Sequence, residues 1–420
     1  MKLNLNGYSH TDASPIREAL GYIRYLEATN GEKPLLMAYT PVARMNPYQA
    51  LTYKSFARNN ISTIPLIKPL FFDQLTQLKP QVADVLLHLH WNSFVLGAAA
   101  DRDDAIKRLS SFKNRLLSFK NEGGKVMWTV HNILPHDATH LDLEIDLQQF
   151  IADQSDIIHT MSHHTSKAVE DVLSLDESKL LMSPHPSYLG AYEDYVARDE
   201  ARITLGLDPD EVVYVILGAI KGYKGIQEFI DGFDAACEGS SLRRRLIIAG
   251  EPDDSDEISK LVTRCNLHPN ILIDARKIPY NLVQLYLRSA DILAVPYQRA
   301  LNSGSAMLGP SFELPVISSR AGSLPEVLQP GFTEFIDGPG LSEMSSAITR
   351  ADRLLSAEVR AAAAAFARDL QPAPVSEKFA IGIKERLVSL NSNGADLEPS
   401  QEMRKPHGVG FAELNAVKGS

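Results

Sequence analysis

The chain has 420 residues and a mass of 46.3 kDa, which corresponds to two or three domains of ordinary size. Its residues are 44% hydrophobic and 22% charged, which is typical of a globular protein and excludes a disordered, collagen-like or coiled-coil chain. The net charge of -10 argues against a nucleic-acid binder, because phosphates require a basic face. Two cysteines, Cys237 and Cys265, are too few for a disulfide framework, so we expect a reducing compartment.

Neither the N-terminal residues nor any later segment has the apolar length that membrane insertion requires. Residues 1–15 are polar where a signal peptide has an apolar core, and no run of about 18 apolar residues occurs. We therefore expect a cytoplasmic protein, with peripheral contact to the inner face of the membrane as an open alternative.

Short apolar runs alternate with longer stretches of helical period, and this alternation predicts α/β domains with parallel sheets. In the first half the predicted strands are 35–39, 61–67, 85–91, 126–130, 157–161 and 180–183. In the second half they are 212–220, 246–250, 271–274, 292–296 and 316–318.

The series of strands is interrupted once, between Ser183 and Val212. Residues 184–190 are rich in helix and strand breakers and a charged segment follows, which indicates a linker and then a short helix. We therefore predict two Rossmann-like domains that face each other across a cleft. The predicted parts are a first domain at 1–190, a second domain at 191–375, a helix at 376–390 that returns to the first domain, and a loosely ordered tail at 391–420.

Open parallel sheets bind ligands at the carboxyl ends of their strands, so polar residues that follow strands are candidate site residues. His131 follows the run 126–130, and Asp137 lies six residues later. We predict both as catalytic, since a histidine can hydrogen-bond a sugar and a carboxylate can act as a general base. The alternative is structural, with His131 capping the strand and Asp137 capping the next helix.

His88 and His90 alternate near the end of the preceding predicted strand, directly before Trp91. A pair of histidines on one face is compatible with a metal site, but the sequence shows no third ligand that would complete it. We predict no metal and interpret both residues as histidines of the core or the cleft.

Lys221 and Lys224 lie between glycines in the segment 217–225, directly before a stretch of helical apolar spacing. A helix N-terminus that a backbone can approach closely, with two cations beside it, is suited to an anion. The alternative is an exposed turn whose lysines only improve solubility.

A second anion-binding pattern follows the predicted strand 292–296. Arg299 is followed by the turn Ser303-Gly304-Ser305, whose N–H groups and hydroxyls can surround a diphosphate while the arginine neutralises it. Glu326 follows the run 316–318 and can accept hydrogen bonds from sugar hydroxyls. The alternative for Glu326 is a carboxylate that stabilises the start of a helix.

In this order, these segments resemble the GT-B glycosyltransferases of the glycogen-synthase-like clan, in particular bacterial enzymes of exopolysaccharide and capsule assembly. The resemblance covers residues 35–390 and is most specific in 218–225, 290–317 and 322–326. It implies that His131 lies beside the donor sugar and that Lys224 binds the donor diphosphate. On the acceptor side it extends to Asn46, Tyr48, His90 and Trp91.

The sequence departs from these relatives at two places. Gly218-Ala219 stands where many of them carry Gly-Arg, so Lys221 or Arg299 has to supply that charge. Retaining members carry two glutamates eight positions apart, and an ungapped alignment places Ala300 and Leu308 there. We therefore expect an inverting mechanism with Asp137 as the base.

The expected activity is the metal-independent transfer of a hexose or uronic acid from a UDP- or GDP-linked sugar to a hydroxyl of a growing glycan. A lipid-linked acceptor is compatible with this activity, and no cofactor is expected besides the donor substrate. Lys221, Lys224, Arg299 and the turn 303–305 would neutralise the departing diphosphate. Two alternatives stay open: a non-catalytic GT-B subunit that activates a partner transferase, and a sugar-nucleotide epimerase or phosphorylase.

Residues 105–125 predict a helix with Ile106, Leu109, Phe112 and Leu116 on one face. Its other faces carry the basic residues Lys107, Arg108, Lys113, Arg115 and Lys120. Such a helix either packs on the core with a solvated basic face or binds anionic lipid.

Overall fold

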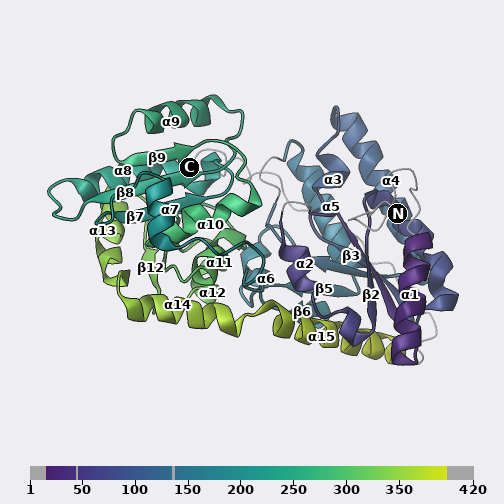
Figure 1. The fold of residues 1–420 in the computed structure, drawn as a ribbon. Coiled ribbons are helices and arrows are strands. Elements are labelled where there is room, and N and C mark those ends of the chain that lie inside the picture. Colours follow the sequence, from purple (N-terminus) through teal and green to yellow (C-terminus); the bar gives the residue numbers. More distant parts are fainter. Residues whose placement is uncertain (1–15, 44–45, 135–137, 395–420) are drawn as a thin grey trace. The chain divides into compact units, whose positions relative to one another are not determined.

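The computed structural model describes residues 16–43, 46–134 and 138–394. The described residues up to Ile383 form one compact unit that contains two six-stranded sheets with helices packed on them (Figure 1). Every strand pairing in both sheets is parallel. The predicted α/β class with two parallel sheets is therefore confirmed.

The first sheet has the strand order β2-β1-β3-β4-β5-β6. Its strands are β1 (Leu35–Thr40), β2 (Ile61–Pro65), β3 (Asp84–Leu89), β4 (Lys125–Thr129), β5 (Ile157–Thr160) and β6 (Leu180–Met182). The helices of this part are α1 (Ile16–Asn30), α2 (Tyr48–Thr52), α3 (Ser93–Leu96), α4 (Arg102–Asn121), α5 (Leu141–Gln154) and α6 (Thr165–Val169). Short 3-10 segments lie at η1 (Ala57–Asn59), η2 (Pro69–Gln81) and η3 (Glu177–Lys179).

The second sheet has the order β12-β11-β10-β7-β8-β9. Its strands are β7 (Val212–Leu217), β8 (Arg244–Ala249), β9 (Ile271–Asp274), β10 (Ile292–Val295), β11 (Val316–Ser319) and β12 (Thr333–Ile336). The helices are α7 (Arg198–Thr204), α8 (Ile226–Cys237), α9 (Asp256–Asn266), α10 (Tyr280–Ser289), α11 (Gly304–Ser311), α12 (Leu324–Val327), α13 (Leu341–Arg350), α14 (Ala357–Asp369) and α15 (Pro372–Gly394). The 3-10 segments are η4 (Gly222–Lys224) and η5 (Ala351–Leu354).

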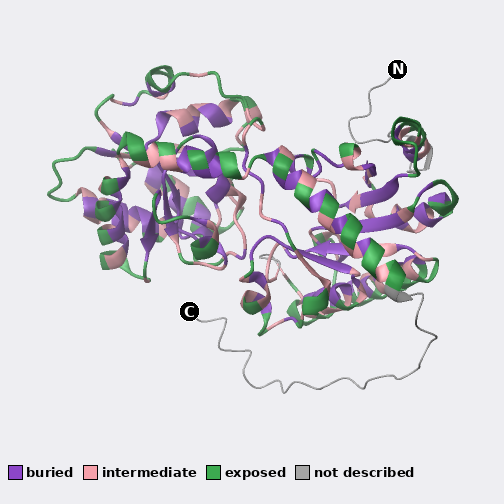
Figure 2. Ribbon diagram, turned by 90° about the horizontal axis from the view of Figure 1, so that it is seen from below, coloured by how far each residue is buried: buried purple, intermediate pink, exposed green. Residues whose placement is uncertain are grey.

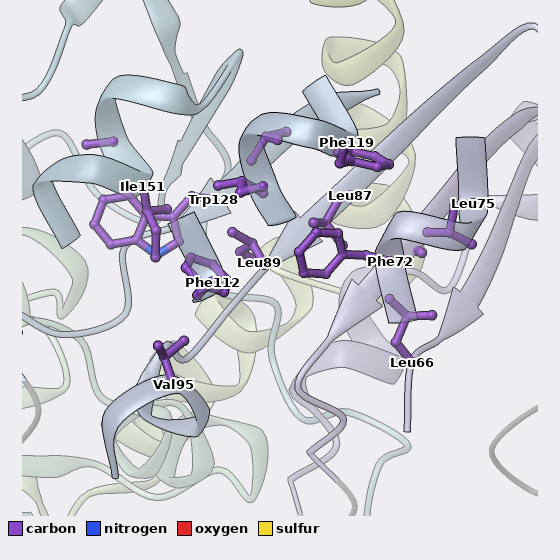
Figure 3. Packing of buried hydrophobic residues seen from close by; sticks show 14 of the residues in the cluster. Leu66, Phe72, Leu75, Leu87, Leu89, Val95, Phe112, Phe119, Trp128 and Ile151 are labelled. Carbon is purple, nitrogen blue, oxygen red and sulfur yellow. The ribbon is translucent and has the colours of Figure 1, made fainter. Parts of the chain in front are cut away.

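Apart from the edge strands β6 and β9, the strands of both sheets are largely buried on their two faces, whereas the outer sides of the helices are exposed (Figure 2). In the core of the first sheet, Phe72 of η2 packs edge-on against Phe112 and Phe119 of α4, with ring centroids 6.2 and 5.8 Å apart (Figure 3). Burial on both faces explains why these strands read as nearly continuous apolar runs in the sequence.

Helix α4 packs its apolar face on this core. The buried residues of the helix are Ala105, Leu109, Phe112, Leu116 and Phe119. Ile106, which the sequence assigned to the same face, is 43% exposed, so that assignment was wrong. Ile106 is three positions before Leu109, a spacing that is typical of one helix face. On this helix, however, that position lies at the edge of the buried face rather than at its centre.

Four of the basic side chains of α4 have acidic partners, which supports the core-packing interpretation of this helix over a lipid-binding one. The pairs are Arg108 with Asp104, Lys113 with Asp146, Arg115 with Asp73, and Lys120 with Asp156. Among the described residues, no helix is long and apolar enough to cross a membrane.

Two boundaries differ from the sequence-based prediction. The sequence treated Pro372 and Pro374 as breakers before a helix at 376–390, but α15 begins at Pro372, because proline is tolerated in the first turn of a helix. The helix also continues to Gly394, into the segment predicted as a tail, and residues 395–420 lie outside the described residues. Early α15 contacts the first part of the chain, since the Ser55 N–H donates to Ser376 Oγ at 2.8 Å.

Candidate active site

Two cavities of similar size lie where strands end. The first encloses about 530 Å³ beside the loops that follow β3 and β4, and the second encloses about 510 Å³ beside the loops that follow β7, β8 and β9. The first cavity is lined by His90, Trp91, Trp128, His131, Glu144 and Gln148, among others. The second is lined by Asn46, Tyr188, Gly218, Lys224, Lys277 and Ser305, among others.

The structure brings the predicted acceptor-side residues together around His131. The indole of Trp91 stacks on the His131 ring, with centroids 4.2 Å apart and planes 18° from parallel. Tyr48 packs edge-on against His131 at 5.3 Å, and Asn46 Oδ1 accepts the Tyr48 N–H at 3.0 Å. Asn46 lines the second cavity, whereas Tyr48 packs against His131, which lines the first.

Behind His131, a continuous series of hydrogen bonds passes through the buried ends of the strands. We call this series the histidine relay. It runs from His131 through His90, Tyr53, His88, Thr129 and His159 to the backbone carbonyl of Ser183. Apart from the short Tyr53–His90 contact, its links measure between 2.7 and 3.1 Å.

The histidines of the relay are neutral at ordinary pH. Burial and the neighbouring imidazoles lower the pKa of His88, His90 and His131 well below the usual value. Burial lowers the pKa of His159 to about 4. Each ring therefore carries one N–H and one accepting nitrogen.

The carbonyl at the end of the relay fixes the direction of every hydrogen bond in it. Because the Ser183 carbonyl can only accept, His159 donates from Nε2 and must accept at Nδ1 from the Thr129 hydroxyl. Thr129 then accepts from His88 Nε2, and His88 Nδ1 accepts from the Tyr53 hydroxyl. Tyr53 in turn accepts from His90 Nε2, so His90 Nδ1 must accept from His131 Nε2. His131 Nδ1 then has a lone pair, which can accept a hydrogen bond from a ligand.

This arrangement supports the interpretation of His88 and His90 as histidines of the core. Both ring nitrogens of each residue are hydrogen-bonded within the relay, so neither has a lone pair left for a metal. Among the described residues, no group of three or more His, Cys, Asp or Glu side chains is arranged to hold a metal ion.

Glu144 is a site residue that the sequence analysis missed. It lies in the first turns of α5, lines the first cavity and is 4% exposed. Burial raises its pKa to about 7, and Asn92 Nδ2 donates to its carboxylate at 3.3 Å. A signal was present, because Glu144 falls on the buried stripe of α5 with Leu147 and Ile151. Asp137, the predicted base, lies outside the described residues.

Lys224 is the central cation of the second cavity. Its side chain is buried, with only 6% of the residue exposed, and its ammonium lies 5.2 Å from the centre of the Tyr297 ring. Gly218 follows β7 with φ of +117°, and a Cβ there would lie 3.3 Å from Lys224 Nζ. The glycine therefore allows the turn and leaves room beside the ammonium.

The predicted Ser303–Ser305 turn is the N-terminus of α11. Ser303 Oγ accepts the Ala306 N–H at 3.1 Å, so this hydroxyl caps the helix. Gly304 and Ser305 line the second cavity, and a Cβ on Gly304 would come within 2.5 Å of the Tyr188 hydroxyl. The first N–H groups of the helix thus lie at the cavity that holds Lys224.

Three other predicted donor residues do not line the second cavity. Arg299 is exposed, and Lys221 lies on the adjacent loop. The Glu326 carboxylate accepts the N–H groups of His163 and His164, both at 2.8 Å. Both oxygens of Glu326 are therefore engaged by backbone donors in this structure.

The second cavity also contains groups that the sequence analysis did not identify. Lys277, on the loop after β9, adds a second cation to its lining. Tyr192 and Tyr280 stack with ring centroids 5.1 Å apart and provide a flat aromatic wall. Neither feature has a local sequence signature. Lys277 reaches the cavity only through the fold of the chain, and the aromatic wall joins two tyrosines that are distant in the sequence.

The loop after β10 also contacts the His131 loop. Asn302 Nδ2 donates to the carbonyls of Val130 and His131, both at 3.3 Å. The backbone beside His131 is thus held by a residue from the loop that precedes α11.

Residues 197–368 match the family model described as Glycosyl transferases group 1. The match covers less than half of the chain, and we refer to the matched residues as the group 1 domain. The group 1 domain includes the whole second sheet, Lys224 and the N-terminus of α11.

Two curated relatives extend this finding. A GDP-mannose:glycolipid 4-beta-D-mannosyltransferase from Xanthomonas campestris is 22% identical over 303 residues, which is 71% of this chain and 77% of that protein. A D-inositol 3-phosphate glycosyltransferase from Actinosynnema mirum is 28% identical over 184 residues, 42% of this chain and 44% of that protein. The second alignment is about the length of the group 1 domain.

Solved structures with the same fold span both sheets. Anabaena HepE in complex with UDP-glucose has a TM-score of 0.63 at 12% identity, and covers 84% of this chain and 99% of that one. The sucrose-phosphate synthase of Thermosynechococcus elongatus has a TM-score of 0.61 at 14% identity, with 86% and 100% covered. The expected GT-B fold is confirmed.

Proposed function

We propose that this glycosyltransferase moves a sugar from a nucleoside diphosphate sugar to a hydroxyl of a growing, lipid-linked glycan. The observation that carries the proposal is the buried side chain of Lys224 beside the N-terminus of α11, in a cavity lined mainly by residues of the group 1 domain. A buried cation and free helix N–H groups are together suited to a diphosphate.

The relatives support the choice of substrates. The Xanthomonas relative is named for a GDP-linked donor and a glycolipid acceptor, and HepE was solved with UDP-glucose. We extend both substrate classes to this chain, with UDP- and GDP-linked sugars as the donors to test. A glycolipid acceptor agrees with assembly of an exopolysaccharide at the cytoplasmic face of a bacterial membrane.

In the reaction that we propose, the acceptor oxygen attacks the anomeric carbon while the bond to the diphosphate breaks. Lys224 and the first N–H groups of α11 stabilise the charge that develops on the leaving diphosphate. Lys221 and Arg299, on the neighbouring loops, are further candidates for the same charge, and Glu326 is a candidate for a sugar hydroxyl. This set of cations supports a reaction that needs no metal ion.

His131 would contact the donor sugar through Nδ1, the nitrogen that the histidine relay leaves as an acceptor. The ungapped alignment places Ala300 and Leu308 where the resemblance implies glutamates in retaining relatives, and on this basis we propose inversion of the anomeric configuration. Inversion requires a base on the acceptor side, and Asp137 is the candidate that the sequence offers. The anomeric proton coupling of the product, measured by NMR, tests this proposal, and a product with the donor's configuration would refute it.

The decisive experiment is calorimetric titration of the full chain with UDP-glucose, GDP-mannose and the corresponding free nucleosides. The proposal expects binding of at least one sugar nucleotide that is much tighter than binding of its nucleoside, and loss of this difference in Lys224→Met. A chain that binds none of these nucleotides would instead be a non-catalytic subunit. A chain that converts the donor without any acceptor would be an epimerase or phosphorylase.

A further inference from the structure

The first cavity has the composition of a site for a neutral ligand with several hydroxyls. One wall is the stacked pair of Trp91 and His131, a flat surface that suits the C–H face of a sugar ring. Its volume of about 530 Å³ is in the range of small-molecule sites.

Two other lining residues contain buried polar atoms that have no partner among the described residues. Gln148 is 1% exposed and its Oε1 accepts no hydrogen bond, and Trp128 is 2% exposed and its Nε1 donates none. Both residues line the cavity. A buried polar atom without a partner costs about 1–3 kcal/mol, so a ligand that reaches either atom would recover part of that cost.

Glu144 lines the same cavity. It is four positions before Gln148 on α5, so the two side chains project from the same face of the helix. Its neighbours Asp142 and Asp146 are instead exposed and paired with Arg102 and Lys113. Glu144 has no ion pair in the described part of the chain and lines the cavity together with His131.

The charges around the cavity restrict what it can bind. No lysine or arginine occurs among its described lining residues, and Glu144 is the one acidic residue in that set. Two of its histidines, His90 and His131, are held neutral by burial, as described above. An anionic ligand would therefore meet a carboxylate and no compensating cation.

We propose that the first cavity binds the acceptor as a neutral glycosyl unit, and that Glu144, rather than Asp137, takes the proton of the attacking hydroxyl. This inference rests on the proposed function. In the step, the acceptor O–H proton moves to the Glu144 carboxylate and the acceptor oxygen forms a bond to the anomeric carbon. The bond from that carbon to the diphosphate oxygen breaks, and its electron pair leaves with the nucleoside diphosphate.

Binding to this cavity can be measured directly, because Trp91 and Trp128 are the two tryptophans of the chain and both line it. The probes are neutral methyl glycosides of glucose, mannose and galactose, titrated against tryptophan fluorescence of the full chain. We expect a saturable change with at least one of them, and at least tenfold weaker binding of methyl glucuronide at pH 8. No response to any neutral glycoside, or equal binding of the glucuronide, would overturn the proposal for this cavity.

The role of Glu144 is tested by the variant Glu144→Gln, with Asp146→Asn as the matched control on the same helix. The readout is release of UDP or GDP from the donor, with the bound methyl glycoside as acceptor. We expect Glu144→Gln to keep glycoside binding but lose at least a hundredfold in kcat, the usual size of a general-base contribution, while Asp146→Asn stays at wild-type level. The wild-type rate should rise with pH through about 7, and this rise should be absent in Glu144→Gln.

Asp137→Asn separates the two candidate bases. If Asp137→Asn loses turnover and Glu144→Gln retains it, the assignment of Glu144 is wrong.

The calorimetric titration with sugar nucleotides keeps the two proposals distinguishable. A chain that responds to glycosides but binds no sugar nucleotide refutes the proposed function, and one that binds the nucleotide but responds to no glycoside refutes only this inference.

Discussion

His90 Nδ1 lies 3.0 Å from His131 Nε2, and this contact connects the surface of the first cavity to a hydrogen-bond series that ends at the Ser183 carbonyl. The tautomer of His131 is thus determined by groups on β3, β4 and β5 and by the residue that follows β6. ¹⁵N spectra of histidine-labelled protein should show His131 protonated at Nε2. A proton on Nδ1 would contradict the direction derived for the histidine relay.

Replacing Thr129 by Val should destabilise the protein, because it leaves His88 Nε2–H and His159 Nδ1 without partners in the core. We expect a loss of about 2–4 kcal/mol in the free energy of unfolding, measured in urea. Thr40→Val is the matched control. Thr40 is also fully buried at a strand end, but its hydroxyl has no hydrogen-bond partner, so its loss should be neutral or stabilising.

Lys224→Ala should reduce turnover by about two orders of magnitude, whereas Lys221→Ala should have a much smaller effect. Lys224 is buried and lines the second cavity, and Lys221 does not line it. Nucleoside diphosphate release under saturating donor measures the difference. Equal and small effects of both substitutions would mean that the leaving-group site lies elsewhere.

Gln148→Met should raise stability and weaken glycoside binding at the same time. The substitution removes a buried Oε1 that has no partner, and it removes a group that we assign to the acceptor. We expect a gain of about 1 kcal/mol in the free energy of unfolding. Gln284→Met is the contrasting variant, because the Gln284 Oε1 accepts the N–H groups of Tyr195 and Val196 and its loss should destabilise.

The stability of the protein should depend on pH through Glu144. Its folded pKa of about 7 is above the ordinary value of 4.5, so the fold favours the protonated form. The associated stabilisation is complete below about pH 4.5 and is lost as the pH rises through 7. Between pH 5 and pH 8, wild type should lose about 2–3 kcal/mol more than Glu144→Gln in denaturant titrations. Parallel pH curves for the two proteins would indicate that Glu144 titrates normally.

Much of the fold could be predicted because parallel strands buried on both faces appear as apolar runs in the sequence. β12 was missed for a tertiary reason. Its four residues include Glu334, whose buried carboxylate is paired with Arg350 at 2.7 Å and Arg353 at 2.9 Å. A glutamate in so short a run argues against a buried strand until those two arginines are known to face it.

The candidate site could be predicted only where one segment carries the chemistry. Lys224 and Ser305 follow strands within glycine-containing turns, and both line the second cavity. Glu144 was missed because Asp142 and Asp146 flank it, and a series of acids on a helix usually marks a solvated face. The difference between an exposed and a buried acid in this series is set by the strand and loops against which α5 packs.

The histidine relay also restricts how this sequence can diverge. Five of its six side chains both give and receive one hydrogen bond, so replacing any of these five leaves two neighbouring groups unsatisfied in the core, whereas His131 only donates and its replacement leaves one. We therefore expect positions 53, 88, 90, 129, 131 and 159 to change as a group among descendants of this chain. Lineages that lose one of these residues should have replaced several of them with apolar side chains of matching volume.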